Sequence, residues 1–207
     1  MRHLFRIAGV FAVSTLWSTS AFATSTGITG QSGKDGVMCS TCHKGGEVPT
    51  VVLEGPATLE PGATGQYTFI MRGGAAKTGG VDIAVDAAGA NLVAGTGTKK
   101  LGAELVHTAP QDFTAGELRF NFSLVAPSTD VTLKLFGAGN SSNADKSSDG
   151  DRAAATTLSV KVGNGTPVVV DPLPAESDSG GCSAAGTAPV WGLALAGLAM
   201  LRRRRQN

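Results

Sequence analysis

Five consecutive residues, Cys39-Ser40-Thr41-Cys42-His43, carry the most distinctive chemistry in this 207-residue sequence. Their pattern, C-x-x-C-H, is the attachment motif of c-type haem. The two thiols would each add to one haem vinyl group, because two intervening residues let both sulfurs reach one edge of the macrocycle. The histidine that follows would supply the proximal ligand of the iron. The sequence therefore predicts one covalently attached haem c, held by Cys39, Cys42 and His43.

Three other interpretations of these cysteines stay open. A Cys39–Cys42 disulfide suits an exported protein, because such compartments oxidise thiols, but it leaves His43 without a role. A redox-active C-x-x-C centre usually opens a helix in a βαβ unit, and the sequence has no such pattern. A zinc site needs four ligands, of which Cys39, Cys42 and His107 would supply three.

The second axial ligand of a haem iron is expected from the few remaining donors. Apart from His43, the predicted mature domain contains one histidine, His107, which lies in a strand-like run and is our expected sixth ligand. Met38 and Met71 are alternatives, because thioethers also ligate haem iron. Met38 is next to Cys39 in the sequence and could not easily reach the opposite face of the haem. Met71 falls on an apolar strand face, which favours packing in the core. A hydrogen-bonded or exposed strand histidine is the alternative role of His107.

A polar run from Asn140 to Asp151 is the second stretch with chemistry-bearing side chains. Asn and Asp at this density can coordinate calcium through side-chain oxygens, although the spacing does not match an EF-hand. We expect a cation here only as an addition, and a polar turn loop is the alternative. The sequence has no G-x-S-x-G, H-E-x-x-H or P-loop motif, so we do not expect an enzyme.

The elements that position these residues are predicted to be short strands. Apolar and polar residues alternate with period two in several runs, which is typical of half-buried antiparallel strands. Glycine and proline turns separate the runs, and no helical period appears in the central region. Seven or eight such strands predict an all-β, antiparallel β-sandwich. The expected strands are residues 50–53, 67–71, 81–85, 91–93, 103–108, 118–124, 131–135 and 158–162.

The two ends of the chain have the character of targeting signals. Residues 1–23 combine a basic start, a short apolar stretch and an A-x-A site ending at Ala23, as a secretory signal peptide does. Residues 163–181 are rich in Pro, Gly and Ser and predict a linker. Residues 184–201 lack charge and would span about 27 Å as a helix, close to the thickness of a bilayer core. The arginines that follow, 202–205, would stay cytoplasmic, so the domain would face outward.

The charges divide between these ends and the middle. The chain has net charge +1, but without Arg2, Arg6 and Arg202–Arg205 it retains 11 basic against 16 acidic residues, a net −5. Nucleic acid and anionic lipid select for a basic face. We therefore expect no nucleic-acid partner for the central domain.

The C-terminal tail begins with Gly181-Cys182-Ser183, followed by Pro189, Trp191, an apolar run and the arginine cluster. In this combination it resembles the MYXO-CTERM sorting signal. It implies that a sorting protease processes the tail of residues 182–207 and that Cys182 becomes the lipid-type anchoring residue. The protein would then be exported and held at the membrane or cell surface.

The central domain has a distinctive order of short motifs: Cys39–His43, Gly55-Pro56, Gly79-Gly80, Val106-His107-Thr108, Ala126-Pro127, Phe136–Asn140 and Gly150-Asp151. In this order it resembles the choice-of-anchor V domain, a bacterial surface module similar to the animal reeler domain. The segment of residues 24–48 and the sandwich domain of residues 49–162 together span this resemblance. It implies a reeler-like or Ig-like sandwich but no settled activity. The leading expectation is a surface-anchored haem module for electron transfer or redox binding, with a redox partner protein. The alternative is a haem-free adhesion or matrix module with a Cys39–Cys42 disulfide.

Overall fold

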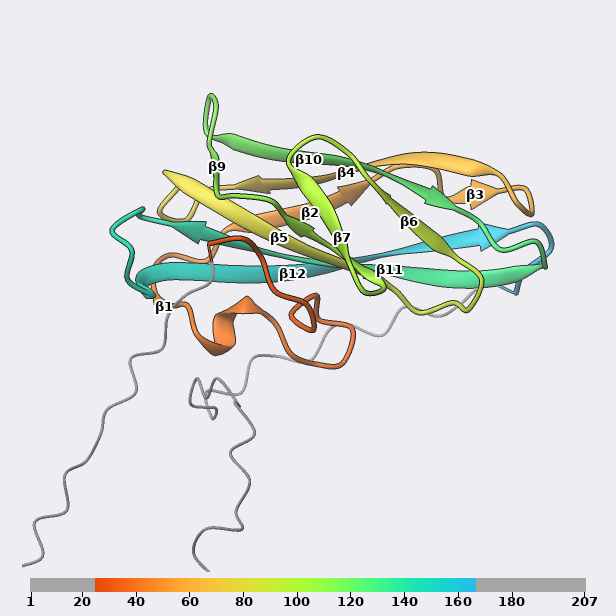
Figure 1. Cartoon of the computed structure of the whole chain (residues 1–207), viewed down its shortest axis with the longest axis horizontal. Coiled ribbons are helices and arrows are strands. Elements are labelled where there is room, and N and C mark those ends of the chain that lie inside the picture. Colours follow the sequence, from red (N-terminus) through yellow and green to blue (C-terminus); the bar gives the residue numbers. More distant parts are fainter. Residues whose placement is uncertain (1–24, 167–207) are drawn as a thin grey trace, which may run out of the picture.

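The computed structural model describes residues 25–166, which form two β-sheets packed face to face (Figure 1). The predicted signal peptide with Ala23, nearly all of the linker, and the tail with Cys182 lie outside the described residues. In the described range, no helix is long and apolar enough to cross a membrane. The elements in chain order are a 3₁₀ helix η1 (Cys39–Thr41) and strands β1 (Lys44–Gly45), β2 (Thr50–Glu54), β3 (Thr58–Leu59), β4 (Thr64–Arg72), β5 (Thr78–Val85), β6 (Asn91–Ala94), β7 (Thr98–Leu101), β8 (Glu104–His107), β9 (Gln111–Asp112), β10 (Glu117–Val125), β11 (Val131–Ser142) and β12 (Asp149–Val162).

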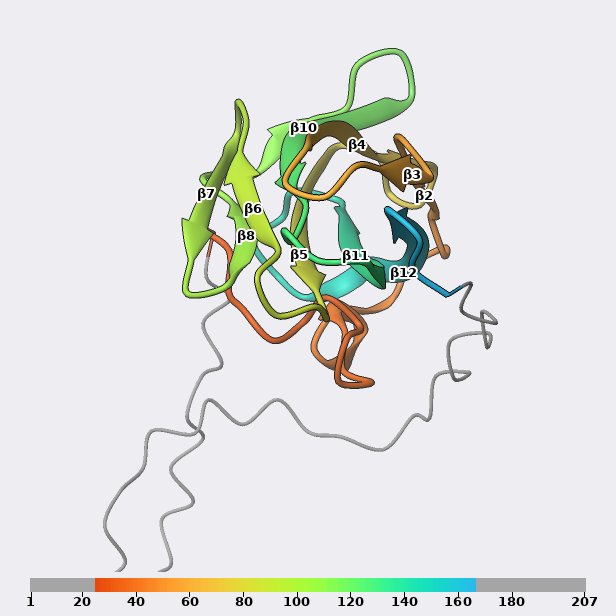
Figure 2. The same cartoon turned by 90° about the vertical axis from the view of Figure 1, so that its right-hand side faces the viewer.

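The larger sheet has the order β1-β12-β11-β5-β8-β7, and β3 and β9 add to it beside β12 and β5. The smaller sheet has the order β2-β4-β10-β6. All pairings are antiparallel except those of the two-residue strands β1 and β3 with β12. The predicted all-β sandwich is therefore confirmed, and Figure 2 shows the two layers end on.

The core lies between the sheets because each long strand places alternate residues on its inner face. Tyr67, Phe69 and Met71 of β4 are buried there, and Phe120 and Phe122 of β10 lie beside them. Full burial of one such side chain contributes roughly 1.5–3 kcal/mol. The larger sheet contributes the remaining core side chains, which include Val81, Ile83, Leu105, Leu133, Leu135, Val160 and Val162.

All eight predicted strand segments are strands in the structure, but four further strands were not expected. The missed strands β1, β3, β7 and β9 have two to four residues, too few to establish a hydrophobic period. Strands β11 and β12 also extend well beyond the predicted apolar runs, to Ser142 and from Asp149. The polar run from Asn140 to Asp151 is thus partly strand, with a loop between its two strand ends.

Residues 25–46, hereafter the N-terminal segment, lie against the outer face of the larger sheet (Figure 1). The outer side chains there include Ala138, Ala153 and Ala155, which are small enough for the segment to approach closely. A Cβ atom added to Gly33 would lie only 3.3 Å from that of Ala155. The segment contains the C-x-x-C-H motif, so its docking places the motif over this face.

Candidate functional site

The C-x-x-C-H motif folds as one tight turn. Helix η1 holds Cys39 to Thr41, and the amides of Cys42 and His43 both donate to the carbonyl of Cys39, at 3.2 and 3.1 Å. The hydroxyl of Thr41 donates to the carbonyl of Met38 at 2.9 Å and supports the start of the turn. These local bonds determine how the two cysteines and the histidine follow one another on the surface of the segment.

His43 is held by a carboxylate from the other end of the domain. Its Nδ1 atom lies 2.9 Å from Oδ2 of Asp151 in β12, which is only 1% exposed. The amide of Asn143 donates to the other carboxylate oxygen at 2.9 Å, and Nδ2 of Asn140 contacts Oδ2 at 3.4 Å. Because an ionised carboxylate only accepts hydrogen bonds, this bond requires a proton on Nδ1 of His43, and in the neutral imidazole Nε2 then keeps its lone pair. Metal-ligating histidines typically have this arrangement.

The thiol of Cys39 turns inward, toward the rest of the N-terminal segment. Its Sγ atom contacts the carbonyl oxygen of Gln31 at 3.9 Å. Burial raises the pKa of this thiol to about 12, and the nearby carboxyl of Asp82 adds to the rise. Cys39 carries a free thiol in the structure. The Cys39–Cys42 disulfide of the alternative interpretation is therefore not formed here, because the Cys39 side chain packs toward Gln31.

The side chain of His107 takes the place of a missing backbone partner in the larger sheet. Strand β8 ends at this residue and β9 begins at Gln111, so on this side β5 would lack a backbone partner at Val81, which pairs with Gly139 of β11 on the other side. The Nδ1 atom of His107 fills that place, 3.1 Å from the amide nitrogen of Val81 and 3.3 Å from its carbonyl oxygen. Burial lowers the pKa of His107, the bond to Val81 opposes that shift, and Lys99 adds to it. His107 thus has the hydrogen-bonded strand position that was the alternative to ligation.

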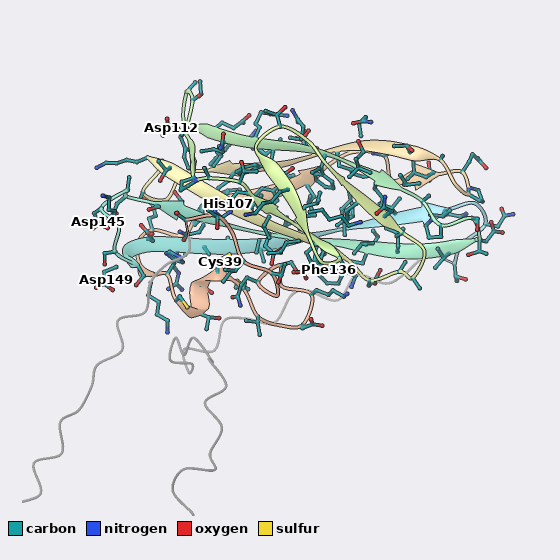
Figure 3. All side chains as sticks on the ribbon, viewed as in Figure 1. Cys39, His107, Asp112, Phe136, Asp145 and Asp149 are labelled. Atoms are coloured by element: carbon teal, nitrogen blue, oxygen red, sulfur yellow. The ribbon has the colours of Figure 1, made fainter. Side chains whose placement is uncertain are left out.

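The structure places His43 and His107 on the same face of the larger sheet. The imidazole of His107 lies over Gly80, where an added Cβ would come within 2.4 Å of the ring. Gly80 pairs with Asn140, and Asn140 contacts Asp151, which holds His43. Strand β11 separates the strands that hold the two rings, a distance of about 10 Å at the usual spacing. Figure 3 labels His107 on the sheet and Cys39 on the segment beside it.

The two methionines that were alternative haem ligands make other contacts in the structure. Met71 is fully buried in the core, as its strand position indicated, and Met38 forms an isolated bridge with Ser32. Within residues 25–166, no three or more His, Cys, Asp or Glu side chains are grouped so that they could hold a metal ion. The structure therefore does not assemble the three zinc ligands Cys39, Cys42 and His107.

The loop between β11 and β12 uses its polar side chains to order its own backbone. Asn143 accepts from the amide of Asp145 at 3.0 Å, and Asp145 accepts from Ser147 at 2.7 Å. Ser147 in turn accepts from the amide of Asp149 at 3.1 Å. Each side chain bonds the amide two residues ahead, as in Asx and Ser/Thr turns. This is the geometry expected of a polar turn loop.

Two buried carboxylates near the motif were not predicted from the sequence. Asp151 belongs to the Gly150-Asp151 pair that closes the polar run, but its contact with His43 depends on strand pairing. Asp82 stands between Val81 and Ile83 in an apolar strand. An acidic residue in such a run is unusual, and this could have marked Asp82 as a candidate functional residue. It is 2% exposed, and its Oδ2 accepts from the amide of Gln31 at 2.7 Å.

Comparison with known proteins identifies no family for this chain. No protein-family model matches the sequence, and no curated protein matches it significantly. One similar solved structure is a CARDB domain from Pyrococcus furiosus, determined in complex with di-metal ions. It has 10% sequence identity, the match covers 58% of this chain and 91% of that chain, and the TM-score is 0.33. At this level of similarity, nothing about a ligand of this chain follows from that structure. The β-sandwich assignment depends on the strand pairing described above.

Proposed function

We propose that this protein is an exported, surface-anchored electron-transfer module that carries one c-type haem on Cys39, Cys42 and His43. The observation that supports it most is the bond between Nδ1 of His43 and the buried carboxylate of Asp151. This bond orients the imidazole and leaves Nε2 as the atom that would bind iron. A histidine that served only as a surface residue would not need a buried carboxylate held by two further residues.

The residue types of the motif are those that hold a haem c, but both sulfurs would have to change their partners first. Cys42 is disulfide-bonded in the structure, so that bond would have to be reduced before its sulfur could attach to a haem. His43, the next residue, is partly exposed. Cys39 would have to turn from the carbonyl of Gln31 to present its sulfur on the same side as His43. A bound haem would supply one-electron transfer chemistry. The chain would provide two thioether attachments, one axial nitrogen, and the carboxylate of Asp151 that keeps the proton on Nδ1.

His107 is our proposed sixth ligand. Its position on the same sheet face as His43 supports this role. Ligation requires the tautomer in which Nδ1 donates to the carbonyl of Val81, since Nε2 then keeps its lone pair. A sixfold-ligated iron favours electron transfer over oxygen chemistry, because no coordination position stays open.

The proposed location follows from the two ends of the sequence. The signal peptide with cleavage after Ala23 would export the chain, and the tail from Cys182 would anchor it after a sorting protease has acted. The domain would face away from the cytoplasm and meet a redox partner protein. A cation at residues 140–151 remains an additional proposal, supported by the oxygen-rich side chains of the loop.

Haem attachment is tested by producing the exported protein together with cytochrome c maturation machinery. After denaturation and extraction, the visible spectrum should show haem that stays bound to the polypeptide. The variants Cys39→Ser and Cys42→Ser should each lose one thioether link, whereas Thr41→Ser keeps the supporting hydroxyl and should behave as the wild type. Absence of bound haem in the wild-type protein would overturn the proposal.

Two further measurements test the finer assignments. His107→Ala should convert the low-spin spectrum to a high-spin one, and an unchanged low-spin spectrum would exclude His107 as the sixth ligand. The mass of the mature protein should lack every residue after Cys182. A mature chain that still ends in the arginine cluster would contradict processing at this site.

A haem-free adhesion or matrix module is the second candidate. The observation that favours it is the inward position of the Cys39 thiol, which is packed toward Gln31 in the structure. The haem-attachment experiment distinguishes the two candidates, because this module would be exported without a covalently bound chromophore.

A further inference from the structure

Two acidic side chains hold the N-terminal segment on the larger sheet. The amide of Gln31 donates to Oδ2 of Asp82 at 2.7 Å, and the amide of Gly30 donates to Oε2 of Glu104 at 2.6 Å. Asp82 lies in β5 and Glu104 in β8, so consecutive amides of the segment bind adjacent strands. These bonds join residues 51 and 74 positions apart, and they precede the C-x-x-C-H motif by eight residues or more.

The two carboxyl groups also face each other. Asp82 pairs with Val106 across the strands, and Glu104 lies two residues further along on the same sheet face. Asp82 is 2% exposed, and its Oδ1 atom has no hydrogen-bond partner. A bare carboxylate oxygen buried in this way is costly. A proton on Oδ1 would convert that oxygen into a donor directed at the carboxylate of Glu104.

The titratable group that acts on Asp82 is Glu104 of β8. Two lysines lie nearby: Lys99 of β7 pairs with Val106, the partner of Asp82, and Lys34 of the segment lines a pocket together with Glu104. From η1, the thiol of Cys39 faces Asp82, which helps to raise the pKa of that thiol. On β11, the neighbouring residues of this face are Ala138 and Asn140, which do not titrate. Burial, with the adjacent Glu104, raises the pKa of Asp82 to about 7, although the amides of Gln31 and Ile83 oppose the rise.

We propose that Asp82, when it carries a proton beside Glu104, forms a pH-dependent latch that holds the N-terminal segment on the outer face of the sandwich. With the proton present, each carboxyl group accepts one segment amide without repelling its neighbour. Loss of the proton places two negative charges side by side in a poorly solvated site, which weakens the docking of residues 25–46. The segment that presents Cys39 and His43 is thus held more loosely as the pH rises. This inference does not depend on haem attachment.

The sign of the effect follows from linkage. The docked state raises the pKa of Asp82 from 3.8 to about 7, so it binds more protons than an open state with an ordinary carboxyl group. Docking is therefore strongest at low pH, weakens as the pH rises from about 4 to about 7, and then stays constant. The largest change that one group can produce is about tenfold per pH unit.

Hydrogen–deuterium exchange of the haem-free full chain tests the latch. After correction for intrinsic exchange, the protection factors of the amides of Gly30 and Gln31 should fall at least tenfold between pH 5 and pH 7 and then level off. Asp82→Asn imitates the protonated carboxyl group, so its protection should stay constant over this range. Asp112→Asn, at an exposed carboxylate in β9, is the matched control and should retain the wild-type profile.

Two outcomes would overturn the latch. One is a wild-type profile that is flat between pH 5 and pH 7, and the other is an Asp82→Asn profile with the wild-type slope. If Asp82→Asn does not fold, Glu104→Gln provides the second variant. It removes the neighbouring charge and should reduce the slope, and an unchanged slope would also contradict the latch.

Discussion

The Nδ1 atom of His43 lies 2.9 Å from Oδ2 of Asp151, although 108 residues separate the two in the chain. The contact joins the C-x-x-C-H motif to the start of β12, the last strand of the sandwich. Because Asp151 is buried and bonded by Asn143 as well, it cannot turn away without losing several hydrogen bonds. This pair connects the local motif to the tertiary fold.

Replacing Asp151 by Asn should weaken both the fold and the orientation of His43. The substitution removes the charge that accepts bonds from His43 and from the amide of Asn143. We expect the free energy of unfolding, measured in urea, to fall by about 1–3 kcal/mol, the usual range for lost hydrogen bonds to a charged group. In the haem-loaded protein, the reduction potential should rise, because the imidazole becomes a weaker donor. Asp149→Asn, at the exposed neighbour in the same strand, should change neither quantity appreciably.

His107 should stabilise the fold more at neutral than at acidic pH. Its pKa is lowered in the folded state, so that state binds fewer protons than the unfolded chain below about pH 6.5. The contribution is complete above the ordinary pKa and is lost as the pH falls. Asp82 acts in the opposite direction, so the informative quantity is the stability difference between wild type and His107→Gln in urea. That difference should be larger at pH 7.5 than at pH 5, and equal values would contradict the assignment.

Gly80 should be required because the ring of His107 lies on its backbone. An added Cβ would come within 2.4 Å of Cε1 of His107 and force the ring from Val81. Gly80→Ala should therefore cost about 1–3 kcal/mol, the range for overpacking. In a His107→Ala background the cost should fall, and a double-mutant cycle should give a coupling energy above about 0.5 kcal/mol. Additive effects would show that the two residues act independently.

Tyr67 should titrate as a buried phenol. It is 2% exposed, and its hydroxyl donates to the carbonyl of Pro56 at 2.9 Å. Burial raises its pKa to about 12, so the stability that depends on the neutral phenol is lost as the pH rises from about 10 to 12. Tyr67 is the single tyrosine of the chain, so the near-ultraviolet absorbance of tyrosinate reports on it alone. If the phenol of Tyr67 titrated near pH 10 in the folded protein, the hydroxyl would not be buried as described.

Much of the fold was predictable because strand periodicity is local. Phe120 and Phe122 alternate with polar residues in the sequence, and both lie in the core. The same reasoning placed Met71 in the core. It missed β9, which has two residues, and it could not establish that His107 bonds the backbone of Val81. That contact arises because β8 ends at His107 and leaves Val81 of β5 without a backbone partner on that side.

The sequence by itself determined the C-x-x-C-H motif, since its chemistry depends on residues within one turn, and the sandwich class, since alternation within each strand predicts one buried face. Only the tertiary structure decided which distant groups surround the motif. Asp151 meets His43, Asp82 and Glu104 hold Gln31 and Gly30, and His107 shares a sheet face with His43, because the register of β5, β8, β11 and β12 brings them there. Strand register depends on all inner faces packing at once, and no short stretch of sequence contains that information.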